Sequence, residues 1–529
     1  MKTTEQRRKH PSALDLGTLI LIIILSSMGA IVGLELITRL GTTPNTSIIG
    51  ALVAIVIAKV PLTFLRKYKD VNTQNLLQTA ISGSTFSAAN GLMLPIGVTF
   101  LMGKPELVWP MLIGAALAVI TDATILYFSF DSKVFPAEAA WPPGIATAEA
   151  IKTAAEKGKS GIILILGIIG GAIGKFFGIP TDILGVAFIG NVFALTAFGI
   201  GLLTRGYVPQ FTGIDLMKLY LPHGVMIGAG IAALIQIVKI IKSEKDAEDG
   251  SQYNTTRSTK DLKKGLGKGY IAYIGVALLL AIISGLMTEM SMGMLLLWII
   301  FAATAAIVSE LIVGIAAMYS GWFPAFATAL IFLVLGMLIG FPPIALALLV
   351  GFTASTGPAF ADMAYDFKAG WILRGEGKDP EFEREGRKQQ YIAELISFMV
   401  AIIMVGLVHQ FYFAQDLVPP VDRVYVATIQ AGTNPEVAKY LLLWAIPGLL
   451  IQFIGGPSKQ LGVLFATGLL INSPIAGITV LVGLLIRTLV IKIKGKEVQG
   501  ILYILGAGSI AGAALFSFFK STIQLGKVK

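Results

Sequence analysis

The feature that most constrains this chain is its succession of apolar runs, each close to the length that crosses a lipid bilayer. A membrane-spanning helix needs roughly 20 consecutive apolar residues, and about a dozen or more such runs follow one another here. Hydrophobic residues make up 55% of the chain and charged residues 14%, whereas a soluble domain carries about 25% charged residues. We therefore predict an all-α polytopic membrane protein with about 14–16 transmembrane helices, some of them broken by proline or re-entrant.

One long hydrophilic stretch divides the apolar runs into two halves. Residues 242–268 are predicted to be a cytoplasmic linker between an N-terminal transmembrane half, 1–241, and a C-terminal transmembrane half, 269–529. The basic start of the chain favours a cytoplasmic N-terminus in a multi-pass protein of the plasma (cytoplasmic) membrane. The first half has about seven obvious spans. If the N-terminus and the linker both lie in the cytoplasm, an even number of crossings must separate them. Residues 131–158 are therefore the candidate for a hidden crossing.

The rest of the composition excludes several kinds of chemistry. The chain has no cysteine and three histidines that are far apart in sequence, His10, His223 and His409, so disulfides and thiol chemistry are excluded and a histidine-rich metal centre is not expected. The net charge of +10 lies mostly in loops, which indicates membrane topology and attraction to anionic lipids, not binding to nucleic acid. We expect no cofactor and no resident metal.

A proline-broken stretch, Trp141–Lys152, stands out among the apolar runs. Two adjacent prolines stop a helix, a glycine follows, and a new helix with a carboxylate then begins. Secondary transporters build substrate sites from such discontinuous helices, although a surface loop between two spans is the alternative. The new helix N-terminus would favour an anion, such as a substrate carboxylate. The candidate substrate-binding residues are Pro142, Pro143, Gly144, Thr147 and Glu149.

Two motifs carry a resemblance to a known family. The stretch Trp141–Lys152 reads W-P-P-G-I-A-T-A-E-A-I-K and resembles the F-P-x-G-x-A-x-A-E-V-L-K segment of the oligopeptide transporter (OPT) family, which includes the yellow-stripe-like metal-chelate transporters. Asp366–Gly370 with Arg387–Gln390 resembles its D-L-K-T-G…R-K-Q-Q segment. Ala369 replaces the usual threonine, and 375–386 looks like a charged insertion. The resemblance implies a proton-coupled importer of small peptides or peptide-like metal chelates that works by alternating access.

Two carboxylates lie inside apolar runs. Asp122 and Glu310 are costly in a membrane and are functional candidates by default. Together with Glu149 they are the predicted proton-coupling residues. The alternatives are hydrogen-bonded structural carboxylates, and for Glu149 a first-turn residue that suits the helix dipole.

The second motif supplies a further group, Asp366, Lys368, Gln389 and Gln390, which we predict to form part of a gate or a cytoplasmic network. A solvated charged loop is the usual alternative for such a run of charges. The pattern places the whole segment 362–388 in a polar region between two spans.

Secondary active transport of a small molecule, with protons and the lipid bilayer as the other partners, is the function that these features favour. A passive channel, or a transporter for another small organic solute, is the alternative. An enzyme is not expected, because the chain has no H-E-x-x-H and no G-x-S-x-G sequence. No G-x-x-x-x-G-K-[ST] phosphate loop is present, which argues against ATP-driven transport within this chain. The substrate and the oligomeric state are left open by the sequence.

Overall fold

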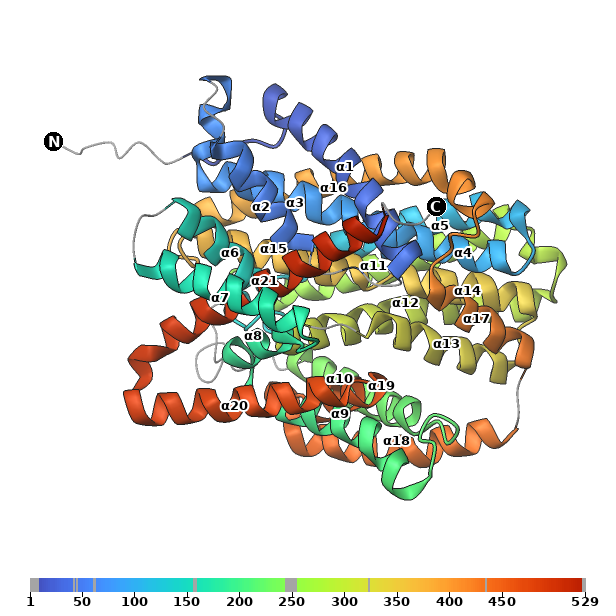
Figure 1. The fold of residues 1–529 in the computed structure, drawn as a ribbon. Coiled ribbons are helices and arrows are strands. Elements are labelled where there is room, and N and C mark those ends of the chain that lie inside the picture. The colour runs from blue at the N-terminus through green and yellow to red at the C-terminus, as the bar shows by residue number, and fades with distance from the viewer. Residues whose placement is uncertain are drawn as a thin grey trace.

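The computed structural model of this chain describes residues 9–40, 43, 46–59, 63–155, 159–242, 255–321, 324–432 and 435–525. Residues 1–8 and 243–254, which carry the basic start and much of the predicted linker, lie outside this part. Within it the regular structure is helical, apart from one isolated bridge between Phe130 and Phe135 (Figure 1). The predicted all-α architecture is confirmed.

The helices of the first half of the chain end at residue 242. They are α1 (Leu16–Leu40), α2 (Thr46–Lys59), α3 (Val71–Phe86), α4 (Leu94–Leu101), α5 (Val108–Ser129), α6 (Pro142–Ala155), α7 (Lys159–Phe176), α8 (Thr181–Ile189), α9 (Val192–Thr212) and α10 (Leu221–Lys242).

The helices of the second half begin after the predicted linker. They are α11 (Thr259–Ile283), α12 (Met292–Ser320), α13 (Ala325–Ile339), α14 (Pro343–Ser355), α15 (Pro358–Leu373), α16 (Pro380–Ala414), α17 (Pro420–Ala431), α18 (Pro435–Lys459, with a break at Gly456), α19 (Leu461–Leu470), α20 (Pro474–Lys494) and α21 (Gln499–Leu525).

The described residues contain 11 helical segments that are long and apolar enough to cross a membrane. Five shorter apolar helices of 10–17 residues account for further apolar runs of the sequence. Large apolar side chains such as Ile271, Leu407 and Ile454 are exposed on the outer helices, as expected for surfaces that face lipid. The chain is therefore an integral, multi-pass membrane protein.

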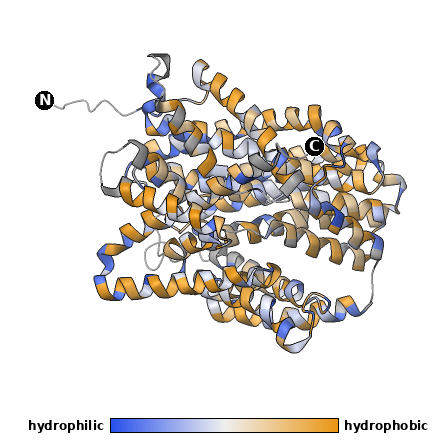
Figure 2. Ribbon diagram, viewed as in Figure 1, coloured by the Kyte–Doolittle hydropathy of each residue, from blue (hydrophilic) through white to orange (hydrophobic). Residues whose placement is uncertain are grey.

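The helices lie side by side in stacked groups (Figure 1). At one side α1, α2, α3 and α16 pack together, and at the opposite side α9, α10, α18, α19 and α20 do so. Between them lie α5, α6, α12, α14 and α15. Along the peripheral helix α20 hydrophobic residues predominate, whereas paler and hydrophilic residues are found in the interior near α3 and α15 (Figure 2).

Helices from the two halves of the sequence pack closely on each other. Gly167 and Gly171 of α7 lie against the backbone of α21, where an added Cβ would meet Leu505 O at 2.8 Å and Ser509 O at 2.4 Å. Small residues allow this approach between membrane helices. The division of the chain into 1–241 and 269–529 remains a prediction about sequence order, since one hydrophobic core contains residues from both parts.

Prolines mark many of the helix starts. Proline lacks an amide hydrogen, and the first turn of a helix does not need one. Accordingly α6 begins at Pro142, and Pro324 and Pro342 directly precede α13 and α14. Pro95 instead lies within a continuous helical segment, where the π-helical turn Ser87–Met93 joins α3 to α4.

Residues 131–155, the described part of the stretch 131–158, contain one short helix. The 14 residues of α6 extend for about 21 Å at 1.5 Å per residue, which is less than the roughly 30 Å hydrocarbon core. By length, α6 alone cannot cross the membrane.

The prediction of a polar region between spans at 362–388 is wrong for residues 362–373. Residues Pro358–Leu373 form α15, which is almost wholly buried, and Asp379 caps the start of the long helix α16 by accepting the amides of Glu381 and Phe382. Only a short turn separates the two helices. The polar side chains of α15, Asp362, Asp366 and Lys368, therefore lie in the protein interior, whereas 376–381 are mostly exposed.

Candidate functional site

The proline-broken stretch is held at its start by backbone contacts. Trp141 adopts a φ of 39°, and its amide donates to Met318 O at 3.0 Å. Thr147 is buried, and its hydroxyl has no hydrogen-bond partner among the described residues. Glu149 is partly exposed and lies 3.9 Å from Lys152. The predicted residues of this stretch thus occupy one short helix but face different surroundings.

The two sequence motifs touch each other in space. An added Cβ on Gly144 of α6 would lie 2.5 Å from Tyr365 O of α15, so the glycine permits this close contact. Lys368 of α15 donates from Nζ to Ala137 O at 2.7 Å, just before α6, and lies 4.4 Å from the ring centre of Trp371. The first motif and the second motif therefore meet along the contact between α6 and α15.

The predicted gate residues do not form a single group. Asp366 Oδ1 accepts from Ser47 Oγ at 2.7 Å and from Gln78 Nε2 at 2.5 Å. Gln390 donates from Nε2 to Asp366 O at 2.7 Å, which joins α16 to α15. Gln389 instead accepts from the amide of Ala13 at 2.9 Å. Asp366 and Gln390 share one network, whereas Gln389 faces the N-terminal segment and Lys368 faces the loop before α6.

Asp122 and Glu310 come together in the protein interior. Both are fully buried, on α5 and α12. The Tyr273 hydroxyl donates to Glu310 Oε2 at 2.8 Å, and Asp122 Oδ2 accepts the amides of Gly357 and Phe360 at 3.0 and 2.8 Å. Asp122 Oδ1 and Glu310 Oε1 have no other partner among the described residues, and one proton between the two carboxyl groups would join them.

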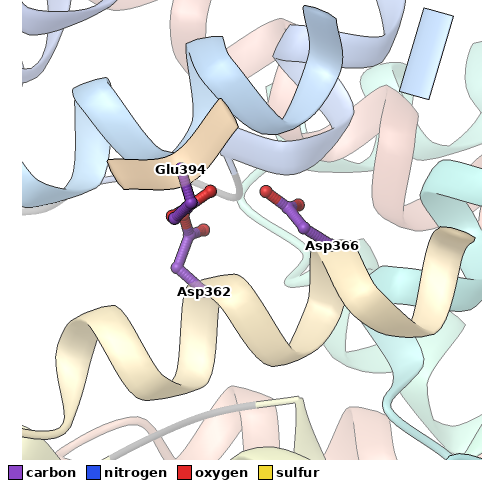
Figure 3. A group of neighbouring side chains, drawn as sticks. All are labelled: Asp362, Asp366 and Glu394. Atoms are coloured by element: carbon purple, nitrogen blue, oxygen red, sulfur yellow. The ribbon is translucent and has the colours of Figure 1, made fainter. Parts of the chain in front are cut away.

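Three further buried carboxylates form a cluster that we call the carboxylate triad: Asp362 and Asp366 of α15, and Glu394 of α16 (Figure 3). One oxygen from each lies within 4.8 Å of the others. Asp362 Oδ1 accepts from Thr46 Oγ1 at 3.1 Å, and Asp362 Oδ2 accepts from Ser82 Oγ at 2.9 Å. The sequence analysis included Asp366 but missed Asp362 and Glu394.

The carboxylate triad carries a strong mutual repulsion when it is ionised. Two unit charges 4.8 Å apart repel by about 3.5 kcal/mol at an effective dielectric constant of about 20. No lysine or arginine forms an ion pair with the three residues in the part of the chain that the structure describes. Such a group of carboxylates needs protons or a cation to compensate its charge.

Gly83 of α3 allows Glu394 to reach this cluster. A Cβ on Gly83 would lie 2.4 Å from Glu394 Oε1. The signal in the sequence was the small and hydroxyl-rich segment around this glycine, because hydroxyls such as that of Ser82 can bond across membrane helices. Asp362 and Asp366 had a signal too, since residues four apart lie on one face of a helix.

Two cavities adjoin the contact between α6 and α15. The smaller, of about 280 Å³, is lined by Thr46, Asn90, Pro143, Asp362 and Tyr365, among others. Both apolar and polar groups line it, which is typical of a small-molecule site.

The larger cavity, of about 690 Å³, is lined by Glu149, Tyr319, Lys368, Trp371 and Arg487, among others. Residues of α6 and α15 thus contribute to the walls of both cavities. Glu149 and Lys368 belong to the larger cavity, whereas Pro143 belongs to the smaller.

A buried network of charges lies beside the turn between α15 and α16. Arg374 donates to both oxygens of Glu383, at 2.7 and 3.0 Å. Arg387 donates to Glu383 Oε1 at 3.1 Å and to Asp131 Oδ2 at 3.3 Å. Asp131 in turn accepts the amide of Thr256 at 3.1 Å. We call Asp131, Arg374, Glu383 and Arg387 the arginine network. With Thr256 it joins three distant parts of the chain: the loop before α6, the segment before α11, and the turn between α15 and α16.

The N-terminal segment packs on the same region. His10 lies 5.3 Å from Phe382, measured between ring centres. Burial, and then the nearby charge of Arg374, lower the pKa of His10 to about 4. Asp15 pairs with Lys67, and this hydrogen bond holds the pKa of Asp15 below its usual value. The start of α1, the turn before α3 and the arginine network therefore lie at one side of the helix assembly.

Taken together, the fold and these sites define a multi-pass α-helical membrane protein whose interior holds cavities and ionisable side chains, as transporters do. A model of the family described as OPT oligopeptide transporter protein matches residues 16–204 and 179–523. The chain belongs to this family, whose members are transporters and not enzymes. No curated protein matches the chain as a relative.

Proposed function

We propose that the protein is a secondary active importer that uses the proton gradient to take up short peptides or peptide-like metal chelates, such as those of the yellow-stripe-like group, by alternating access. The observation that carries this proposal is the direct contact between the two motif segments, where a Cβ on Gly144 would lie 2.7 Å from Cβ of Lys368, in the walls of two cavities. A shift of α15 against α6 would change both cavities together, which is what alternating access requires.

The smaller cavity has the chemistry to bind a peptide-like molecule. Asp362 and Asp182 in its wall supply carboxylates for a substrate ammonium group. Pro143, at the N-terminus of α6, also lines it, and a helix N-terminus favours an anion such as a substrate carboxylate. In this proposal Pro142, Pro143 and Gly144 shape that end of the cavity, and Glu149 acts from the larger cavity.

Asp122 and Glu310 are the proposed proton carriers. Asp122 accepts the amides of Gly357 and Phe360 at the start of α15, so its charge acts directly on the helix that contributes to both cavities. A proton shared with Glu310 weakens Asp122 as an acceptor. Loss and gain of that proton would therefore change how firmly the start of α15 is held.

We also propose an orientation in which the side that carries the arginine network faces the cytoplasm of a plasma-membrane protein. Lys67 pairs with Asp15 there, and Ala13 bonds to Gln389. Basic residues beside span ends favour the cytoplasmic side. Lys368 and Glu376 then make the larger cavity the cytoplasmic vestibule of the transporter.

Transport by the purified protein in proteoliposomes tests the proposal. With an inward proton gradient we expect accumulation of a substrate from a pool of di-, tri- and tetrapeptides or of metal chelates, and its collapse with an uncoupler. Glu310→Gln should abolish accumulation but keep exchange of substrate across the membrane, and Glu149→Gln should reduce uptake. Glu106→Gln, an exposed carboxylate near Lys104, is the matched control and should behave as the unchanged protein.

Flux that only equilibrates, with no response to the gradient, would contradict coupling and favour a passive channel. Accumulation that survives Glu310→Gln would keep the transporter but remove Glu310 as a proton carrier. Uptake that is unchanged in Glu149→Gln would exclude a role of this carboxylate in the substrate path.

A further inference from the structure

We propose that the carboxylate triad, Asp362, Asp366 and Glu394, binds one hard divalent cation of the Mg²⁺, Ca²⁺ or Mn²⁺ type. The binding itself does not depend on the transport activity proposed above, whereas the part that the cation plays in transport does. Three observations carry the inference: the spacing of the oxygens, the unpaired oxygens of Asp366 and Glu394, and the uncompensated charge.

The spacing suits a single ion. One oxygen from each carboxylate lies within 4.8 Å of the other two. Oxygens bind Mg²⁺ at about 2.1 Å and Ca²⁺ at about 2.3–2.6 Å, so two ligands on opposite sides of one ion are about 4–5 Å apart. All three residues can therefore contact the same ion without a change of the backbone.

Three oxygens of the carboxylate triad have no hydrogen-bond partner among the described residues. Both carboxylate oxygens of Glu394, and Asp366 Oδ2, are buried and accept no hydrogen bond from any residue that the structure describes. Leaving buried oxygens unpaired is costly. Figure 3 shows the side chains of Asp362 and Asp366 rising from one face of α15 toward Glu394. A cation between them would satisfy these oxygens at once.

A surrounding layer of polar groups orients the ligands. Ser82 and Thr46 donate to Asp362, and Ser47 and Gln78 donate to Asp366 Oδ1. Such outer partners fix the direction of ligand carboxylates in metal sites. They bind both oxygens of Asp362 and Oδ1 of Asp366, and leave Asp366 Oδ2 and the Glu394 carboxylate for the ion.

The charge and the donor type select the class of cation. The two basic residues on or directly after α15 are bonded elsewhere, because Arg374 donates to Glu383 and Gln390 and Lys368 donates to Ala137 O. The three carboxylates can therefore hold a divalent ion and still keep a negative charge. An oxygen-only donor set, without sulfur or imidazole, favours hard cations over zinc or copper.

The site communicates with the smaller cavity. Asp362 and Thr46 line that cavity of about 280 Å³, and Asp362 is also a member of the triad. An ion can therefore reach the triad from the space in which we place the substrate. The cation is then either carried with the substrate or held while substrate passes, and flux measurements separate these two roles.

Titration of the purified, detergent-solubilised full chain with Mn²⁺, followed by electron paramagnetic resonance of the free ion, tests binding. We expect one Mn²⁺ per chain, release of protons on binding, and displacement by Ca²⁺ or Mg²⁺. Glu394→Gln should weaken the affinity at least tenfold. Glu106→Gln, an exposed carboxylate outside the triad, should leave it unchanged.

A second variant tests the proposal even if Glu394→Gln fails to fold. Gly83→Ala keeps all three carboxylates but places a methyl group 2.4 Å from Glu394 Oε1, and should also weaken Mn²⁺ binding at least tenfold. Its control is Gly267→Ala in α11, where a Cβ meets nothing within 4 Å. Elution of each variant as a single species in gel filtration shows that it is folded.

Three results would overturn the proposal. No saturable Mn²⁺ binding by the folded protein would mean that the triad holds protons only. Equal affinity in Glu394→Gln and in the unchanged protein would place the ion elsewhere. Displacement of Mn²⁺ by millimolar Na⁺, with no preference for Ca²⁺ or Mg²⁺, would show that the site binds monovalent cations.

A separate measurement of transport in proteoliposomes tells whether the ion itself is transported. Accumulation of radioactive Mn²⁺ with the substrate makes the ion a transported species, whereas uptake of substrate that needs Mn²⁺ without its accumulation makes it a resident ion. Mn²⁺ binding without any solute transport would leave the site in place and contradict only the proposed function.

Discussion

Removing the charge of Glu383 should destabilise the protein strongly, although the residue lies away from both cavities. Glu383→Gln keeps the shape of the side chain but leaves Arg374 and Arg387 without their shared carboxylate, and both arginine side chains are at most 1% exposed. Breaking a buried ion pair by removing one partner costs about 3–5 kcal/mol, because the other charge stays buried and unpaired.

The size of the expected thermal shift follows from the chain length. A typical unfolding entropy of about 2.1 cal/mol/K per residue gives about 1.1 kcal/mol/K for 529 residues. A loss of 3–5 kcal/mol then lowers Tm by about 3–5 °C. Helices that persist in the unfolded membrane protein reduce the entropy change, so the shift should be at least this large.

Intrinsic fluorescence during heating of the detergent-solubilised protein measures this shift. The control is Glu385→Gln, which removes a carboxylate that is 45% exposed and 3.9 Å from Lys388; surface pairs contribute only about 0–1 kcal/mol. A Tm for Glu383→Gln within 1 °C of that of Glu385→Gln would refute the reasoning. It would mean that water or relaxation compensates the two arginines.

Two further predictions concern the packing of α6 and the docking of the N-terminal segment. Gly144→Ala places a Cβ 2.5 Å from Tyr365 O, so it should lower the free energy of unfolding by about 1–3 kcal/mol and reduce the rate of substrate uptake. The control Gly170→Ala, whose added Cβ has nothing within 4 Å, should change neither quantity. Equal uptake by the two variants would contradict the role of this contact. Because the pKa of His10 in the folded protein is lowered to about 4 by burial and then by Arg374, the unfolded segment binds the proton first. The stability of docking is then complete above the unfolded pKa of about 6.5 and is lost as the pH falls from there toward 4. Hydrogen exchange of residues 9–15, corrected for the intrinsic rate at each pH, should rise over that interval, and the same rise in His10→Gln would exclude the histidine as its cause.

The fold class could be predicted from the sequence because hydropathy acts over whole helices. Runs of about 20 apolar residues have no other stable arrangement in lipid than helices. The proline pair in the stretch Trp141–Lys152 also predicted the start of a new helix, which begins at Pro142. Pro95 does not interrupt its helical segment, because a π-helical turn precedes it, and such a turn has no simple sequence signal.

The interior position of α15 could not be predicted in the same way. Asp362, Asp366 and Lys368 place three charged residues within seven positions, a pattern typical of a solvated segment. They are buried because α3 and α16 supply hydroxyl and amide partners, such as Ser82 and Gln390. Those partners are far away in the sequence. A pattern read from a short window of residues therefore predicts neither the burial of these side chains nor their cluster with Glu394.

The close contact between α7 and α21 has a consequence for synthesis in the cell. Gly167 lies against Gly508, which is made about 340 residues later, or roughly 17–70 s at a synthesis rate of about 5–20 residues per second. For that time the glycine-lined face of α7 is without its final neighbour. Lipid or the insertion machinery must cover it meanwhile, so the order of assembly requires α7 to wait in the membrane until the last helix is delivered.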